Sequence, residues 1–261
     1  MTPSEKIVQA RKLLHEAGQE LTVILQNDRS RARGNLLREL HSLGRMTGEG
    51  GHYFSQAGQD RIVDNILGYK TGGVFVDVGG YDGVTGSNSL FFEVFRGWSG
   101  ILVEPAPTQL RKAKSVRRCP CLGYAVAGLA GTLDFMEVTS GYTQMSGFLD
   151  SYDRDLLARV RGDSRHVEVV HTLDTKPLGD ILTEQGISSV DFLSLDVEGG
   201  EMDILRNFDF NAFDVDLWSI ENNTQDSQIP ELMRDNGYDL IEFVGVDDVF
   251  RKRKKPQKET V

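Results

Sequence analysis

Apolar residues recur at alternating steps of three and four along the first part of the chain, which places them on one side of an α-helix. Six residues form this stripe: Ile7, Ala10, Leu14, Ala17, Leu21 and Ile24. A second apolar cluster, from Leu36 to Leu43, follows an arginine-rich stretch and precedes a glycine-rich segment. The pattern predicts a helical N-terminal arm over residues 1–50. Either the arm dimerises or covers an active site, or it is an amphipathic helix that lies on its own domain.

Beyond the arm, short apolar runs alternate with helical segments, which is typical of an α/β domain. The runs rich in β-branched and aromatic residues cover residues 73–78, 101–103, 121–127, 131–138, 166–171, 189–195 and 215–220. Two more strands, in residues 236–244 and 246–250, end a domain that we expect to span residues 51–250. Residues 139–166 are a polar insertion expected to shape a pocket, and residues 251–261 form a basic tail.

The first strand ends in Asp77 and is followed by three glycines, Gly79, Gly80 and Gly83. A nucleotide-like ligand binds at such a strand end in an open α/β sheet. A dinucleotide fold would need G-x-G-x-x-G, and the Asp77 carboxylate would repel a phosphate. A ligand with an amino-acid end, a nucleoside end and no phosphate fits better, and S-adenosylmethionine is such a ligand. Glu104, at the end of the second strand, can accept hydrogen bonds from both ribose hydroxyls.

Two further segments are candidates for the same ligand. The third predicted strand, residues 121–127, ends in small apolar residues, so Ala125 and Val126 suit an adenine ring. A glutamine-rich turn that includes Gln59 lies just before the first strand and is placed to reach the ligand end of the sheet. Simple capping of the following helix is the alternative for that turn.

Three carboxylates, Asp196, Glu198 and Glu201, follow the strand at residues 189–195 within six positions. Such charges are costly to bury unless a cation balances them. The neighbouring strand ends in Glu221 and Asn222. Asp196, Glu221 and Asn222 therefore form a candidate set of oxygen ligands for a magnesium or calcium ion. The alternative is that the two glutamates of the first group form ion pairs or cap the next helix.

A general base is needed if no metal binds, and Glu198 and His171 are the candidates. A second histidine, His166, begins the same strand-like run as His171. Histidines in such runs are more often structural partners or exposed, and that interpretation stays open for both.

Composition limits the classes of partner. The 261-residue chain has a formal net charge of −10, which argues against a general nucleic-acid binder. No apolar run approaches the roughly 18 residues of a transmembrane helix, and the polar N-terminus lacks the apolar core of a signal peptide. The two cysteines, Cys119 and Cys121, are too few for a zinc site, and we expect reduced thiols in a cytoplasmic protein.

Several motifs together resemble the FkbM-type S-adenosylmethionine-dependent methyltransferases. They are Asp77-Val78-Gly79-Gly80-Tyr81-Asp82-Gly83, Ser87-Asn88-Ser89, Val103-Glu104-Pro105, the stretch from Asp191 to Glu201 and the turn from Ser55 to Asp60. The resemblance covers residues 52–250. It implies a class I methyltransferase (Rossmann-like) sheet of seven strands, the last of them antiparallel, and methyl transfer to a hydroxyl of a sugar, glycan or polyketide-like molecule.

The resemblance also implies roles for individual residues. Asp77 and Gly79 would flank the methionine end of the cofactor, and Ser87 and Asn88 would lie near its carboxylate. Glu104 would hold the ribose. The full set of candidate cofactor-binding residues is Gln59, Asp77, Gly79, Asp82, Ser87, Asn88, Glu104, Pro105, Ala125, Val126 and Asp196.

The chain departs from the family pattern at two positions. Ser194 stands where the family often carries lysine, and Tyr81 stands at the middle glycine of the loop. Separately, Asp196 with Glu221 and Asn222 is similar to the metal triad of catechol-type O-methyltransferases, with glutamate in place of one aspartate.

These observations favour an S-adenosylmethionine-dependent O-methyltransferase, with or without magnesium. The competing hypothesis is a non-catalytic interaction module that kept the sheet and lost the chemistry. A nicotinamide dehydrogenase is disfavoured by the missing glycine pattern. We expect a small-molecule or glycan acceptor, and a homo-oligomer would form through the N-terminal helices.

Overall fold

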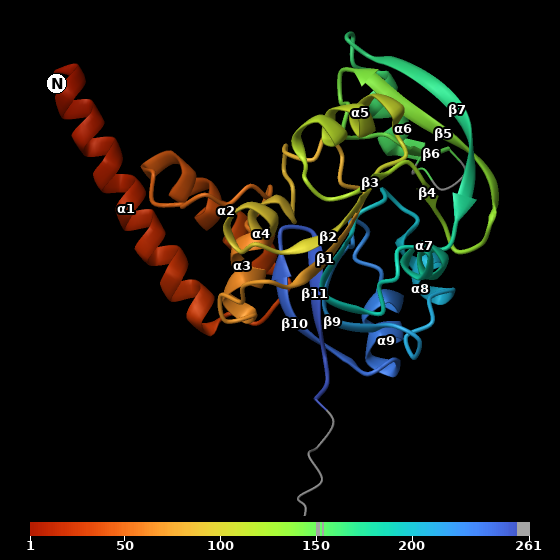
Figure 1. Cartoon of the computed structure of the whole chain (residues 1–261). Coiled ribbons are helices and arrows are strands. Elements are labelled where there is room, and N and C mark those ends of the chain that lie inside the picture. The colour runs from red at the N-terminus through yellow and green to blue at the C-terminus, as the bar shows by residue number, and fades with distance from the viewer. Residues whose placement is uncertain (150–151, 153, 255–261) are drawn as a thin grey trace, which may run out of the picture.

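The computed structural model describes residues 1–149, 152 and 154–254 (Figure 1). The helices are α1 (Pro3–Asn27), α2 (Ala32–Thr47), α3 (Gln59–Ile66), α4 (Leu90–Phe95), α5 (Pro107–Val116), α6 (Arg154–Arg161), α7 (Leu178–Glu184), α8 (Glu201–Arg206) and α9 (Gln228–Asp235). The strands are β1 (Val74–Val78), β2 (Ser99–Val103), β3 (Cys121–Leu122), β4 (Ala125–Val126), β5 (Gly131–Ser140), β6 (Gly147–Phe148), β7 (Val167–Lys176), β8 (Ser189–Leu195), β9 (Asp214–Glu221), β10 (Tyr238–Val244) and β11 (Asp247–Lys252).

Seven strands form the main sheet, in the order β10-β11-β9-β8-β1-β2-β3. β1 pairs in parallel with both β2 and β8, and β8 pairs in parallel with β9. The last strand, β11, lies between β9 and β10 and is antiparallel to both. The predicted seven-stranded, mostly parallel sheet with an antiparallel last strand is therefore present.

Helices cover both faces of this sheet. Successive residues of a strand point to opposite faces, so the neighbours Phe192 and Leu193 of β8 belong to different core layers. Leu193 packs in one layer with residues of α7, α8 and α9. Phe192 packs in the other layer with residues of α2, α3 and α4. Burial on both faces explains why the central strands are almost continuously apolar.

The arginine-rich stretch of the arm anchors α2 on the edge of the main sheet. Arg33 forms a two-pronged ion pair with Glu242 of β10, at 2.5 and 2.6 Å. Arg31 pairs with the buried Asp248 of β11. Gly245, in the turn between these strands, donates a backbone hydrogen bond of 2.9 Å to the carbonyl of Gly34. α2 therefore lies on its own domain, as one of the two interpretations of the arm expects.

α1 packs on α2 along one side and projects beyond it (Figure 1). Its less exposed residues, Leu14, Gly18, Leu21 and Leu25, share that side, whereas every residue up to Leu13 is exposed. None of the described residues of α1 or α2 lines the cavity at the carboxyl ends of β1, β2 and β8, so these helices do not form part of its wall. Among the helices of the described ranges, none is both long and apolar enough to cross a membrane.

A second sheet of four strands, in the order β4-β7-β5-β6, lies beyond the end of the main sheet (Figure 1). The long strands β5 and β7 pair antiparallel, from Gly131 opposite Thr175 to Ser140 opposite Val167. This sheet and α6 are built largely from the predicted insertion and the strands that flank it.

The sequence predicts a single strand, the third, over residues 121–127, and this prediction is wrong. Only Cys121 and Leu122 pair with β2 in the main sheet. The chain then leaves that sheet, and Ala125 and Val126 pair with Thr175 and Lys176 of β7 instead. An apolar run of this length does not distinguish one strand from two short ones that belong to different sheets.

Strand β11 extends two residues into the range expected for the basic tail. Lys252 forms an ion pair of 2.6 Å with Asp214, and Arg251 lies 3.4 Å from Asp216. Both basic side chains therefore form ion pairs between β11 and β9. Residues 255–261 of the expected tail lie outside the described residues.

We predict that Gly34→Ala destabilises the protein, because its new Cβ would lie 2.2 Å from the Gly245 carbonyl oxygen. Crowding of this kind costs about 1–3 kcal/mol, measurable by urea denaturation. Gly18→Ala is the matched control, since its Cβ would meet Leu43 at an ordinary 3.4 Å. Alanine is also a better helix former than glycine, by up to about 1 kcal/mol. Equal effects of the two substitutions would show that the approach of α2 to the sheet does not limit stability.

Candidate functional site

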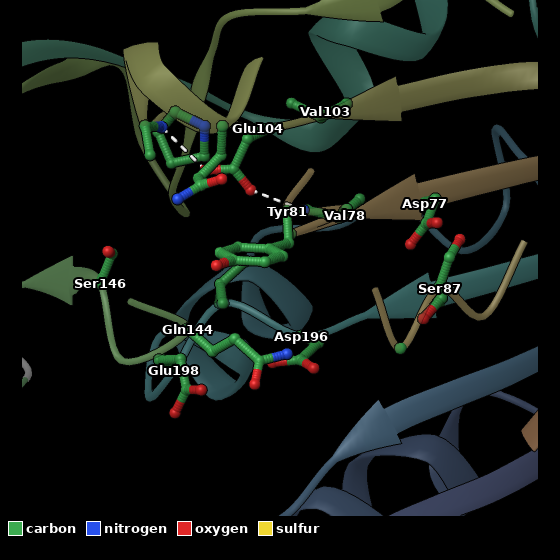
Figure 2. Close-up of a pocket in the computed structure, with 18 of the residues that line it drawn as sticks. Asp77, Val78, Tyr81, Ser87, Val103, Glu104, Gln144, Ser146, Asp196 and Glu198 are labelled. Atoms are coloured by element: carbon green, nitrogen blue, oxygen red, sulfur yellow. Dashed lines mark hydrogen bonds between the residues drawn. The ribbon is translucent and has the colours of Figure 1, made fainter. Parts of the chain in front are cut away.

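A cavity opens at the carboxyl ends of β1, β2 and β8 (Figure 2). The chain places β2 and β3 on one side of β1 and later places β8 and β9 on the other. Ligands of open α/β sheets bind at such a reversal of strand order. The cavity measures about 890 Å³, including the part that is open to solvent.

Most of the predicted site residues meet in this cavity. Those that line it are Asp77, Gly79, Ser87, Asn88, Glu104, Pro105, Val126, Asp196 and Glu198. Lining residues that sequence reasoning did not select include Gln56, Tyr81, Thr85, Phe135, Gln144, Ser146, Phe148 and Ser194. The glutamine-rich turn thus reaches the cavity as expected, but through Gln56 and not through Gln59.

Asp77 is buried at the end of β1, and burial raises the pKa of its carboxyl. Ser89 donates a hydrogen bond to this carboxylate. The same Ser89 hydroxyl accepts one of 2.9 Å from Arg117, whose guanidinium is ion-paired with Glu93 at 2.5 Å. Arg117 opposes the effect of burial on Asp77. A fully buried positive charge therefore stands behind the first strand end.

Sequence reasoning missed Arg117. Basic residues on a surface helix usually form a solvated face, and Arg111, Lys112 and Lys114 of α5 are indeed exposed. Arg117 follows directly after the end of α5 and turns inward. Only its position one residue past the helix end sets it apart in the sequence, and that signal is weak.

Glu104 lies at the end of β2 and accepts backbone hydrogen bonds of 2.8 Å from Tyr81 and from Ala106. Burial raises the pKa of Glu104 to about 7. Figure 2 shows Tyr81 between Glu104 and Gln144. Tyr81 has a φ of +49°, which non-glycine residues adopt rarely, and its hydroxyl lies 2.6 Å from Thr143 Oγ1. Tyr81 thus adopts the left-handed conformation that a glycine would adopt here, and contacts of its amide and its hydroxyl hold it in place.

Asn88 offers an acceptor that the protein leaves unused. Its amide nitrogen donates to Ser194 Oγ at 2.9 Å, while its buried Oδ1 has no hydrogen-bond partner in the described residues. A buried acceptor without a partner is costly, so a ligand that donates to it is favoured. The serine that replaces the lysine of the family pattern therefore orients Asn88.

The second sheet supplies an apolar wall. Val126 of β4, Phe135 of β5 and Phe148 of β6 line the cavity on this side. Ala125 lies behind them, packed with Phe135. The insertion also contributes the polar residues Gln144 and Ser146, so it shapes the pocket as the sequence predicts.

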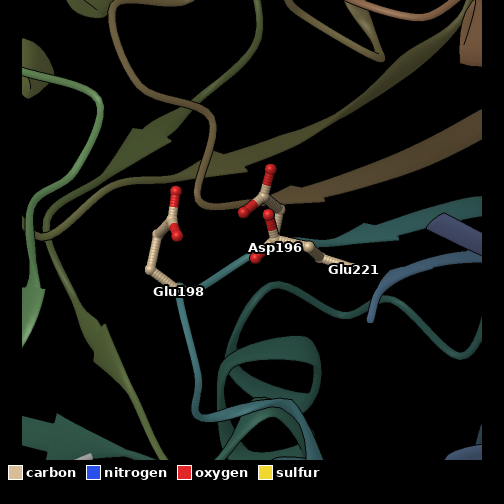
Figure 3. Close-up of side chains that lie close together, drawn as sticks. All are labelled: Asp196, Glu198 and Glu221. Atoms are coloured by element: carbon tan, nitrogen blue, oxygen red, sulfur yellow. The ribbon is translucent and has the colours of Figure 1, made fainter. Parts of the chain in front are cut away.

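Asp196, Glu198 and Glu221 lie close together (Figure 3), and the first two of them line the cavity. Each offers a carboxylate oxygen, and these oxygens lie within 4.8 Å of one another. Burial, reinforced by neighbouring carboxylates, raises the pKa of all three. Like charges this close repel one another, so the cluster favours either a bound cation or a proton on at least one carboxylate.

Gly79 lets the glycine loop approach this acid cluster. A Cβ at this position would lie 1.6 Å from the carbonyl oxygen of Asp196, and the residue has a φ of +85°. Only glycine fits such an approach without displacing the backbone. Glu201 is separate from the cluster, because it accepts the N–H groups of Val197 and Gly199. Both N–H groups belong to the loop before α8, so Glu201 holds that loop and does not cap the helix, and no described cation pairs with it.

The predicted metal ligand Asn222 and the predicted general base His171 lie outside the acid cluster and the cavity. Asn222 is not in the acid cluster, because its amide binds the backbone of Asp226 and the carboxylate of Asp248. Glu198 takes its place. His171 does not line the cavity either, since it lies on β7 with its ring 2.9 Å from Glu137.

Two predicted cofactor residues support loops and do not line the cavity. Gln59 begins α3 and accepts the N–H of Ala57 at 2.9 Å. Asp82 accepts the N–H groups of Val84 and Thr85, at 2.9 and 2.7 Å. Short polar side chains bind neighbouring backbone in this way in many turns, so proximity in sequence to the glycine loop was a poor guide.

We predict that the acid cluster makes the protein less stable as pH rises above about 4. The native carboxyls keep protons that the unfolded chain has released, so the free energy of unfolding falls with rising pH. Glu221→Gln should raise the free energy of unfolding at pH 8, by at most about 1.4 kcal/mol for each pH unit above the ordinary carboxyl pKa, and should have little effect near pH 4.

Urea denaturation with a metal chelator present measures this. The control is Glu231→Gln, on the exposed side of α9, which should leave the pH dependence unchanged. A wild-type stability that is constant or rises from pH 5 to pH 8 would contradict the prediction.

Comparison with known families identifies the domain that contains the cavity. The profile of the methyltransferase FkbM domain matches residues 77–240, from the acid at the end of β1 into β10. This match covers more than half of the chain and includes the cavity acids Asp77, Glu104 and Asp196. No curated protein matches the chain. The predicted family is confirmed, and the chain belongs to the FkbM methyltransferase family.

Proposed function

We propose that this methyltransferase transfers a methyl group from S-adenosylmethionine to a hydroxyl oxygen of a sugar, glycan or polyketide-like acceptor. The observation that carries the proposal is the shared cavity of Asp77, Glu104 and the unpaired Asn88 Oδ1. We also propose that the strand order, with β11 between β9 and β10, is the class I methyltransferase arrangement.

The cavity offers a group for each part of the cofactor. Glu104 would accept the ribose hydroxyls, because its two backbone contacts leave lone pairs free. Asn88 Oδ1 and Asp77 would face the ammonium group, and Ser87 would face the carboxylate, whose charge the buried Arg117 favours. The apolar wall of β4, β5 and β6 would cover the adenine.

When bound, S-adenosylmethionine supplies a methyl group on a positively charged sulfur, and transfer leaves a neutral thioether. The acceptor hydroxyl must give up its proton as its oxygen forms the new bond. Glu198 lines the cavity, and its raised pKa suits a general base that works near neutral pH. His171 lies outside the cavity, so we assign this role to Glu198.

A magnesium ion held by Asp196, Glu198 and Glu221 is an alternative use of the same carboxylates. Three hard oxygen ligands within 4.8 Å of one another fit such an ion, and its charge would relieve their repulsion. A bound metal lowers the pKa of a coordinated hydroxyl. The magnesium dependence of transfer separates the metal from the general base.

The acceptor is expected to be polar and rich in hydroxyl groups. Beside the acid cluster, the cavity is lined by the amide of Gln144 and the hydroxyl of Ser146 (Figure 2). Side chains of this kind hydrogen-bond hydroxyls, and a site built for hydroxyls rejects analogues that lack them.

Two measurements test the proposed function. Calorimetric titration with S-adenosylmethionine tests cofactor binding, and titration with a nicotinamide dinucleotide is the comparison. Methyl transfer from labelled cofactor to a panel of sugars, glycolipids and phenols, with and without magnesium, tests catalysis. Absence of cofactor binding would favour a non-catalytic interaction module.

We predict that affinity for S-adenosylmethionine rises as pH increases from 6 to 8. The pKa of Glu104 is about 7 in the free protein, and its ionised form is the better acceptor for ribose hydroxyls. Glu104→Gln should weaken binding by about tenfold or more, as loss of a charge-assisted hydrogen bond implies, and remove most of this pH dependence. The variant keeping the wild-type affinity and pH profile would contradict the assignment.

We predict that Asp196→Ala reduces methyl transfer at least about 100-fold, the usual scale for loss of an acid–base or metal-positioning group, with cofactor affinity nearly intact. Calorimetry and labelled transfer measure the two effects on one preparation. Asp235→Ala, an exposed substitution on α9, is the control. Loss of cofactor affinity instead would refute the assignment of Asp196 to the acceptor end.

A further inference from the structure

α2 supports the C-terminal half of α1, and the N-terminal half of α1 extends beyond it. α1 has 25 residues and α2 has 16, which at 1.5 Å per residue correspond to about 37 and 24 Å. Contacts with α2 involve Gly18, which approaches Leu43, and Leu25. All residues up to Leu13 are exposed. A single helical segment of this length is marginal in water without a packing partner.

α1 also presents an apolar stripe that α2 leaves uncovered. At about 100° per residue, Ala10, Leu13, Ala17 and Ile24 fall on one side of the helix, next to the side that packs on α2. Leu13 is 57 % exposed and Ile24 is 47 % exposed. The alanines in the middle of the stripe would allow another helix to approach closely. The stripe thus has the composition of a helix–helix contact.

The charges of α1 indicate what that other helix is. Residues 1–15 carry Lys6, Arg11 and Lys12 against one acid, Glu5, whereas residues 16–28 carry acids and no basic residue. A second α1 running in the opposite direction would place the basic half of each copy beside the acidic half of the other. A parallel pair would place like charges side by side, which is unfavourable.

We propose that α1 is the contact surface for a second copy of this chain, in an antiparallel helix pair. The stripe of Ala10, Leu13, Ala17 and Ile24 forms its apolar seam, and the two oppositely charged halves set its direction. The anchoring of α2 on the sheet by Arg31 and Arg33 fixes the base of each arm to its own domain. The inference does not depend on the methyltransferase function.

Sedimentation velocity of the full chain at low salt, over a range of concentrations, tests this proposal. We expect a dimer, and Leu13→Glu should raise its dissociation constant at least about tenfold. The matched control is Val8→Glu, a residue 68 % exposed that lies about 140° around the helix from Leu13. A monomer at all concentrations, or equal effects of both substitutions, would overturn the proposal.

Charge reversal tests the direction of the pair. Reversing Lys6, Arg11 and Lys12 to Glu should weaken the dimer, and reversing Glu16 and Glu20 to Lys should also weaken it. A chain carrying both sets should dimerise again, because each half again faces its opposite. Failure to recover, with unchanged helix content by circular dichroism, would exclude the antiparallel pair. All of these positions are exposed, so the variants are expected to fold.

Discussion

The central constraint on this structure is that it buries carboxylates at the carboxyl ends of three adjacent strands, and each of these charges needs stabilisation. Asp77 at the end of β1 is compensated from behind by Arg117 through Ser89. Glu104 at the end of β2 is held by two backbone N–H groups. Asp196 at the end of β8 faces other carboxylates, and none of the described residues pairs a positive charge with it. Among the described residues, negative charge is therefore left unbalanced at the acid cluster, and a cation or a proton would balance it there.

Much of the fold could be predicted from the sequence because it depends on local patterns. Continuous apolar runs such as residues 189–195 form central strands, and the hairpin of β10 and β11 follows from two runs joined by a glycine-containing turn. The second sheet could not be predicted in this way. Ala125 and Val126 pair with residues about 50 positions later, and no local signal records such a partner.

The residues of the site likewise divide into those that the sequence predicts and those that it does not. Acids at strand ends, Asp77, Glu104 and Asp196, were found because parallel strands bring their carboxyl ends to one edge of the sheet. Arg117 and Asn222 were misjudged, since their roles depend on which way a side chain turns after its element ends. The insertion was expected to shape the pocket, but Gln144 and Ser146 could not be singled out within a polar segment.

Tyr81 joins two parts of the cavity wall that are distant in sequence. Its amide binds the carboxylate at the end of β2, and its hydroxyl binds Thr143 of the insertion. Under the proposed function, a nucleoside held by Glu104 would also steady the segment around Thr143. One residue would thus couple occupancy of the pocket at β2 to the order of the insertion, and a donor that binds first would prepare the site for its acceptor.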